Sequence, residues 1–123
     1  MKYPFPEQIE TGKDVVVFFA EYFEDKFGYQ LPKKEWPKTA GFVNYLKNKG
    51  YTPEDIALIV WGKINSCDKV KSVWYCKYDI DKLGHYRNIK QRIDNQKENE
   101  VKYEDIYENE NQNEEGDYFS EYL

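Results

Sequence analysis

The sequence predicts an all-α fold, a small four-helix bundle followed by an acidic and largely irregular C-terminal tail. Apolar residues recur at helical spacing in four stretches, and residues that start or stop helices bracket most of them. After Ile93 the composition changes abruptly to Asn, Gln, Glu and Lys, which is typical of segments without a packed core. We therefore divide the chain into a helical domain over residues 1–95 and a tail over residues 96–123.

The first helix is expected near residues 13–27. Thr11 and Asp14 have the spacing of a reciprocal capping box at its N-terminus. Gly28 comes directly after its last residue, where a glycine commonly ends a helix. Among the apolar residues at helical spacing, Phe19 and Phe23 are assigned to the core.

The second and third helices are expected near residues 37–49 and 53–66. The third has the clearest start signal in the chain, with Thr52 as N-cap, Pro53 at the first helical position and Asp55 at the third. Together these helices supply five expected core residues. They are Val43, Leu46, Ile56, Ile59 and Val60.

The segment over residues 67–78 is rich in aromatic side chains and has no decisive period. A short strand and an irregular aromatic plug packed between helices both fit it. Asp79 is then expected to cap a fourth helix over residues 80–94, which adds Leu83 and Ile89 to the core.

Catalytic and metal-binding patterns are scarce. Cys67, Cys76 and His85 are spaced C-x8-C-x8-H, without the close cysteine pair of a typical zinc site, so we expect two free thiols. The glycines are scattered and form no phosphate-binding loop. We expect no enzyme, no cofactor, no bound metal and no small-molecule substrate.

Apolar stretches are short throughout the chain. None approaches the roughly 20 apolar residues that cross a bilayer. Met1 to Pro4 are not followed by the apolar run of a signal peptide. We therefore expect a cytoplasmic protein that does not bind membranes.

Charge is distributed unevenly along the chain. Residues 96–123 hold ten acidic residues and two lysines, a net charge of −8. Residues 33–92 hold thirteen Lys or Arg and six Asp or Glu, a net charge of +7. A basic body joined to an acidic tail indicates partners selected by charge.

The basic residues near Trp74 and Tyr75 form the first candidate site. Cations interleaved with rings are the residues that neutralise phosphates and stack on bases. The alternative is a solvated polar face beside a core aromatic cluster, with Trp74 in the core. The candidate nucleic-acid-binding residues are Lys69, Lys71, Lys77, Lys82, Arg87, Lys90 and Arg92.

The acidic tail forms the second candidate site. Carboxylates along an extended chain imitate phosphates, and rings provide anchoring area on a basic groove. The alternative is a tail that only increases solubility. The candidate partner-binding residues are Glu104, Asp105, Tyr107, Glu108, Glu114, Glu115, Asp117, Tyr118 and Phe119.

Three sequence motifs carry a family resemblance over about two thirds of the chain. They are FFAEYFEDKFG at residues 18–28, GYTPEDI at residues 50–56 and YRNIKQRI at residues 86–93. Together they resemble the helical domains of DnaD-like phage replication proteins, the replisome organisers and helicase loaders. The resemblance implies association with DNA or the replisome through the last basic helix.

Two functions are therefore expected. The first is a phage-type DNA-replication accessory protein that binds DNA or replisome components through its basic last helix. The second is an acidic DNA mimic, similar to several anti-CRISPR proteins, that blocks the nucleic-acid groove of a host enzyme through its tail. In either case the partner is DNA or a nucleic-acid-processing protein.

Overall fold

The computed structural model describes residues 3–107, and residues 98–107 by their backbone alone. Within this range the predicted all-α fold with four α-helices is confirmed, and no strand is present. A 3-10 helix precedes the last α-helix. The elements in order are α1 (Gly12–Phe27), α2 (Glu35–Asn48), α3 (Pro53–Ser66), η1 (Val73–Lys82) and α4 (Leu83–Tyr107).

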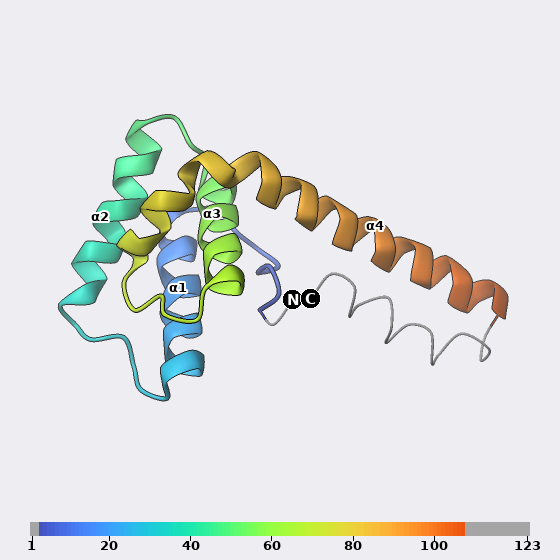
Figure 1. Ribbon diagram of the computed structural model, residues 1–123, viewed down its shortest axis with the longest axis horizontal. Helices are drawn as coiled ribbons and strands as arrows, with labels where there is room; N and C mark the ends of the chain where they lie inside the picture. The colour runs from blue at the N-terminus through green and yellow to red at the C-terminus, as the bar shows by residue number, and fades with distance from the viewer. Residues whose placement is uncertain (1–2, 108–123) are drawn as a thin grey trace.

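The body of the molecule is formed by α1, α2 and α3, with η1 packed against α2 and α3 (Figure 1). The start of α4 contacts α3 and η1, and the rest of this long helix runs away from the body (Figure 1). α1 and α2 approach closely at Gly12. A Cβ atom there would lie 3.0 Å from Cγ1 of Val43, so the absence of a side chain permits this contact.

Both predicted capping boxes are confirmed. The Thr11 hydroxyl accepts a hydrogen bond from the Asp14 amide, and the Asp14 carboxylate accepts one from the Thr11 amide. Thr52 and Asp55 make the same pair of bonds at the start of α3. Gly28 ends α1 in the left-handed conformation, with φ of 79°. These local signals mark the starts of α1 and α3 and the end of α1.

Most of the predicted core is confirmed, because seven of its nine residues are buried. Leu83 and Ile89 are only partly buried at the border of the core, since α4 soon leaves the body. Trp61 of α3 is fully buried, and its indole nitrogen donates a hydrogen bond to the carbonyl of Tyr3 at 2.9 Å. This bond holds the N-terminal segment against α3. The seven confirmed residues are Phe19, Phe23, Val43, Leu46, Ile56, Ile59 and Val60.

Three local predictions differ from the structure. Most of the segment over residues 67–78 is neither strand nor irregular plug, because Val73 onwards forms η1. Asp79 does not cap the last helix; it lies inside η1 with its side chain buried. α4 continues to Tyr107, beyond the predicted end at residue 94, since this stretch has no Gly or Pro and is rich in helix-forming Gln, Lys and Glu.

The C-terminal candidate residues lie mostly beyond this range. Glu104, Asp105 and Tyr107 belong to the end of α4, where only the backbone is described. The remaining tail candidates, Glu108, Glu114, Glu115, Asp117, Tyr118 and Phe119, lie outside the described residues.

No helix of the described part of the chain has both the length and the apolar character to span a membrane.

Candidate nucleic-acid interface

The 3-10 geometry of η1 sorts its side chains into rows. Such a helix has three residues per turn, so every third side chain lies on the same side. Val73, Cys76 and Asp79 form the inward row and are all buried. Tyr75 and Tyr78 form an outward row and are 49% and 74% exposed, so η1 displays two rings to solvent on one side.

Asp79 anchors η1 to its neighbours. Its carboxylate accepts a hydrogen bond from the Tyr86 hydroxyl of α4 and one from Lys63 of α3, whose Nζ lies 3.3 Å away. Burial raises the pKa of Tyr86, and the bond to the Asp79 carboxylate raises it further, so the phenol remains a neutral donor. η1, which presents Tyr75 and Tyr78 to solvent, is therefore held against α3 and α4 by hydrogen bonds on its buried side.

Trp74 lies at the surface and not in the core, contrary to the core alternative. It is 37% exposed. Its ring packs edge-on against Phe42, with centroids 5.2 Å apart, and at a tilt against Tyr45 at 5.8 Å. Because α2 supplies both contacts, the indole is held in place while one side of it remains accessible to solvent.

Lysines lie beside two rings close to η1, Tyr45 and Phe27. The Lys49 ammonium lies 4.5 Å from the centroid of the Tyr45 ring. As a hydrogen-bond donor and as a charge, Lys49 lowers the pKa of Tyr45, and the charge of Lys77 lowers it further. Lys71 lies over the ring of Phe27 at 5.8 Å. The positive charge is thus placed directly beside aromatic surface.

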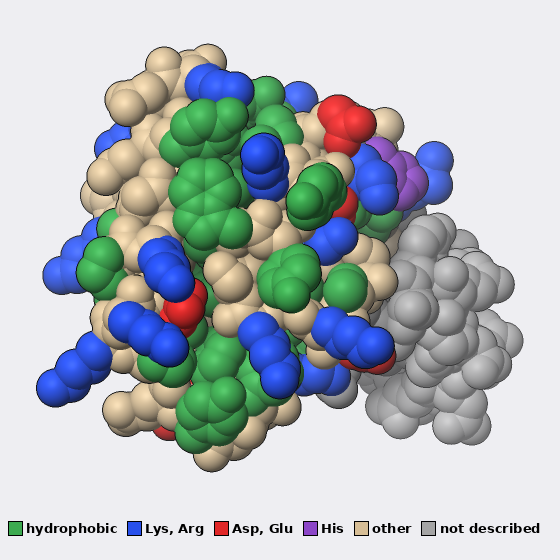
Figure 2. All heavy atoms as spheres, turned by 60° about the vertical axis from the view of Figure 1, so that its left-hand side comes forward, with side chains coloured by type: hydrophobic (Ala, Val, Ile, Leu, Met, Phe, Trp, Pro, Cys, Tyr) green, Lys and Arg blue, Asp and Glu red, His purple; other side chains and the backbone are tan. Residues whose placement is uncertain are grey.

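We name this surface the basic-aromatic face. Figure 2 views the molecule from the side of α2 and η1, where cationic side chains alternate with apolar and aromatic ones and acidic side chains are few. No lysine of the face is ion-paired with a carboxylate among residues 3–97. The face is defined by the exposed rings Trp74, Tyr75 and Tyr78 of η1, by Tyr45, Lys49 and Lys77 beside Trp74, and by the exposed lysines Lys69 and Lys71 that directly precede η1 in the chain.

The other predicted cations are largely engaged with carboxylates. Lys82 is the last residue of η1 and lies 3.7 Å from Asp79. On α4, Arg87 pairs with Asp55 at 2.8 Å. The structure therefore separates the predicted nucleic-acid-binding residues into two groups. Lys69, Lys71 and Lys77 belong to the basic-aromatic face, whereas Lys82 ends η1 and the other three, Arg87, Lys90 and Arg92, lie on α4.

Lys90 and Arg92 differ in their surroundings. Lys90 pairs with Asp94 at 2.8 Å and also lies 5.0 Å from the centroid of the Phe5 ring. Arg92 is exposed and has no ion pair with any side chain that the structure describes. Exposed ion pairs contribute little to stability, so these cations remain able to exchange partners.

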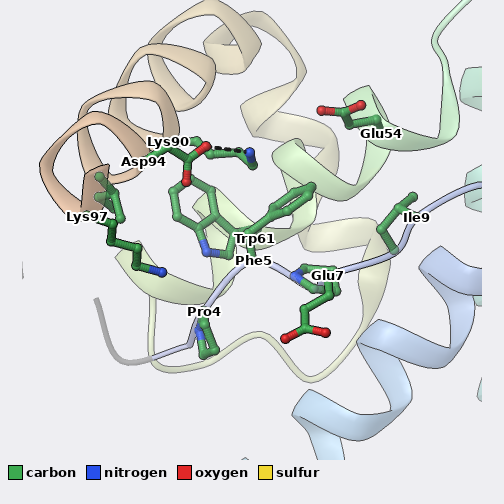
Figure 3. A pocket seen from close by; sticks show the side chains of 11 residues that line it. Pro4, Phe5, Glu7, Ile9, Glu54, Trp61, Lys90, Asp94 and Lys97 are labelled. Carbon is green, nitrogen blue, oxygen red and sulfur yellow. Dashed lines mark hydrogen bonds and ion pairs between the residues drawn. The ribbon is translucent and has the colours of Figure 1, made fainter. Parts of the chain in front are cut away.

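A separate pocket of about 640 Å³ lies between the N-terminal segment, α3 and α4 (Figure 3). Phe5 and Trp61 meet edge to face in its wall, with centroids 6.0 Å apart. Two lysines and three carboxylates line it together with apolar residues. This mixed charge selects neither anions nor cations. The charged residues are Glu7, Glu54, Lys90, Asp94 and Lys97.

The residues considered for catalysis or metal binding, Cys67, Cys76 and His85, differ in their exposure. Cys67 and Cys76 are both free, and burial raises the pKa of the Cys76 thiol, which makes it unreactive. His85 is exposed on α4. Among residues 3–97, no three or more His, Cys, Asp and Glu side chains are grouped as metal ligands would be.

Three residues of the basic-aromatic face are not among the binding residues predicted from the sequence. Tyr45 lies on α2 and Lys49 directly follows this helix, and only the tertiary packing brings them to Trp74 and Lys77. Tyr78 is exposed because η1 turns every three residues, and the sequence of this segment has no decisive period that indicates such a turn. Comparison with protein-family models, curated proteins and solved structures finds no match to this chain.

Proposed function

We propose that this protein is a non-enzymatic accessory protein of phage-type DNA replication that binds single-stranded DNA through its basic-aromatic face. One observation supports this proposal above all. Trp74, Tyr75 and Tyr78 are accessible rings on a fixed element, and the lysines around them have no carboxylate partner among the described residues.

The chemistry favours single strands over duplex. In a duplex the bases stack on one another, so their faces are closed to protein rings, whereas an extended strand offers each base for stacking. Tyr75 and Tyr78 are one 3-10 turn apart, about 6 Å along the helix axis, so each ring can accept a different base. Lysines beside the rings neutralise the phosphates that connect those bases.

In this mode the main DNA contact lies on η1, whereas the sequence predicts it on the last helix, α4. For three of the four cations at Lys82, Arg87, Lys90 and Arg92, a neighbouring carboxylate competes with phosphate. The lysines of the basic-aromatic face have no such competitor among residues 3–97. We therefore expect α4 to contribute second, as an extension of the same positive surface.

The test compares two charge-removal variants of the full chain. We expect Lys69→Ala/Lys71→Ala/Lys77→Ala to weaken single-stranded DNA binding and to lower the salt slope by about 2, at about 0.7 per lost phosphate contact. The variant lacking the four cations of residues 82–92 should change the slope less. Fluorescence anisotropy with a labelled oligonucleotide at several salt concentrations measures both quantities.

A matched control removes three lysines at another site. Lys33→Ala/Lys34→Ala/Lys38→Ala changes the net charge equally and should change the salt slope by much less. Loss of affinity equal to that of the face variant would attribute binding to net charge alone. Absence of any DNA binding by the wild-type chain, or greater loss in the α4 variant, would overturn the proposed mode.

A second candidate function follows from the net charge of −8 over residues 96–123. An acidic, ring-bearing segment can occupy the nucleic-acid groove of a host enzyme as a DNA mimic. This candidate predicts that full-length protein inhibits such an enzyme and that removal of residues 96–123 abolishes inhibition. Inhibition that survives the truncation would exclude it.

A further inference from the structure

An apolar groove of about 600 Å³ runs along the seam between α1 and α2. Its α2 residues are different from the α2 residues that contribute to the basic-aromatic face. Two of its side chains are unusually exposed for their size, Val17 at 37% and Trp36 at 40%. Its apolar lining consists of Val16, Val17, Trp36, Pro37, Ala40 and Val43.

The groove has a fixed shape. The Trp36 indole donates a hydrogen bond to the carbonyl of Leu31 at 3.3 Å, which sets the orientation of the ring. At Gly12 the two helices are in close contact, with Val43 beneath. The stem of Lys47 lies over the same position, since its Cδ would be 3.5 Å from a Cβ of Gly12. Such a preformed apolar surface is typical of peptide-binding sites.

The charge of the groove has one sign. Lys13 and Lys47 are the charged residues that line it among the described part of the chain. Thr11 and Asn44 add neutral polar groups. An apolar floor between two lysines fits a segment that combines aromatic anchors with carboxylates, and it disfavours a cationic peptide.

One segment of this chain has that chemistry. Residues 117–123 read DYFSEYL, in which three rings and a leucine are interleaved with Asp117 and Glu121. We propose that this segment of a second copy docks in the α1–α2 groove, with its rings on the apolar floor and its carboxylates near Lys13 and Lys47.

Chain length argues for a second copy. α4 has 25 residues and is therefore about 37 Å long, and it runs away from α1 and α2 (Figure 1). Only the residues between Tyr107 and Asp117 connect the end of α4 to the docking segment, and their full extension is about 33 Å. This extension is shorter than α4 itself, so we assign the docking to a second copy, whose groove can approach the end of α4.

The test uses full-length variants in sedimentation equilibrium without DNA. Wild type should self-associate with rising concentration, and added salt should weaken the association. Ala40→Glu, which places a carboxylate in the groove, and Tyr118→Ala/Phe119→Ala/Tyr122→Ala, which removes the anchors, should each reduce the association constant more than tenfold. Gly41→Glu is the matched control, because its side chain meets open space on the same helix, and it should associate like wild type.

Mixing the two defective variants gives the decisive result. A mixture of groove-defective and tail-defective chains should form a heterodimer, since one intact groove meets one intact tail. Lys13→Glu/Lys47→Glu provides a second groove variant if Ala40→Glu perturbs folding. A wild-type chain that stays monomeric, or a mixture that stays monomeric, would overturn the proposal. Because no DNA is present, either result is independent of the proposed DNA binding.

Discussion

At Gly62 of α3 the ring of Tyr86 occupies the space where a side chain would begin. A Cβ atom there would overlap that ring, which is itself held by its hydrogen bond to Asp79. Movement of the Tyr86 ring away from Gly62 would therefore weaken its hydrogen bond to Asp79. The absence of a side chain at this position therefore permits the close contact between α3 and the start of α4.

We predict that Gly62→Ala destabilises the protein despite the higher helix propensity of alanine. Overpacking of this kind costs about 1–3 kcal/mol. Urea denaturation followed by circular dichroism measures the change. Gly84→Ala is the control, since a Cβ there meets open space, and the better helix former should raise stability by up to about 1 kcal/mol. Equal stability of Gly62→Ala and wild type would contradict the close packing.

Asp79 illustrates why some residue roles could not be predicted. Its position before an amphipathic stretch is typical of an N-cap, yet in the structure its carboxylate is buried among Lys63, Lys82 and Tyr86. Lys63 lies 16 positions away in the sequence, so no local pattern indicates this contact. Trp74 is a similar case. Its exposure depends on where Phe42 and Tyr45 of α2 lie.

At the scale of elements, the body helices could be predicted and η1 could not. The capping boxes at Thr11 and Thr52 are complete within four residues, so the sequence contains all the information they need. A ten-residue 3-10 helix is unusually long, and its weaker hydrogen-bond geometry depends on the anchoring of its buried row by α3 and α4. The sequence does not indicate the end of α4, because the polar composition after Ile93 occurs both in irregular segments and in exposed helices.

Asp55 links two elements and gives a prediction at this scale. Burial raises its pKa, but hydrogen bonds from Arg87 and Thr52 outweigh this effect and lower the pKa overall. The folded state therefore binds a proton at Asp55 less readily than the unfolded state. Its contribution to stability is complete above the unfolded pKa of about 4 and is lost as the pH falls through the folded pKa.

We predict that Asp55→Asn lowers the free energy of unfolding by about 1 kcal/mol near neutral pH, because the cap at Thr52 and the pair with Arg87 are both weakened. The difference from wild type should shrink as the pH falls below about 4. Denaturant titrations over a series of pH values measure it. A difference that persists unchanged into acid would assign the effect to packing instead of charge.

At the scale of the whole molecule, charge is divided between a basic region and an acidic end. Residues 33–92 carry +7 and residues 96–123 carry −8. The basic-aromatic face lies in the first of these regions, so in the proposed DNA binding the first region would attract the phosphates and the second would repel them. The Debye length is about 30 Å at 0.01 M salt and about 10 Å at 0.1 M, so the two regions influence each other mainly at low salt.

This division predicts how the acidic end tunes DNA binding. Replacing Glu108, Glu110, Glu114 and Glu115 with Gln removes four negative charges and leaves the proposed docking segment at residues 117–123 unchanged. The affinity for single-stranded DNA should rise at low salt, because the repulsion between these carboxylates and the phosphates is removed. Anisotropy titrations across a salt series measure the gain. It should fade as the Debye length shortens, whereas a gain that is independent of salt would indicate that these residues occupy the DNA site by direct contact.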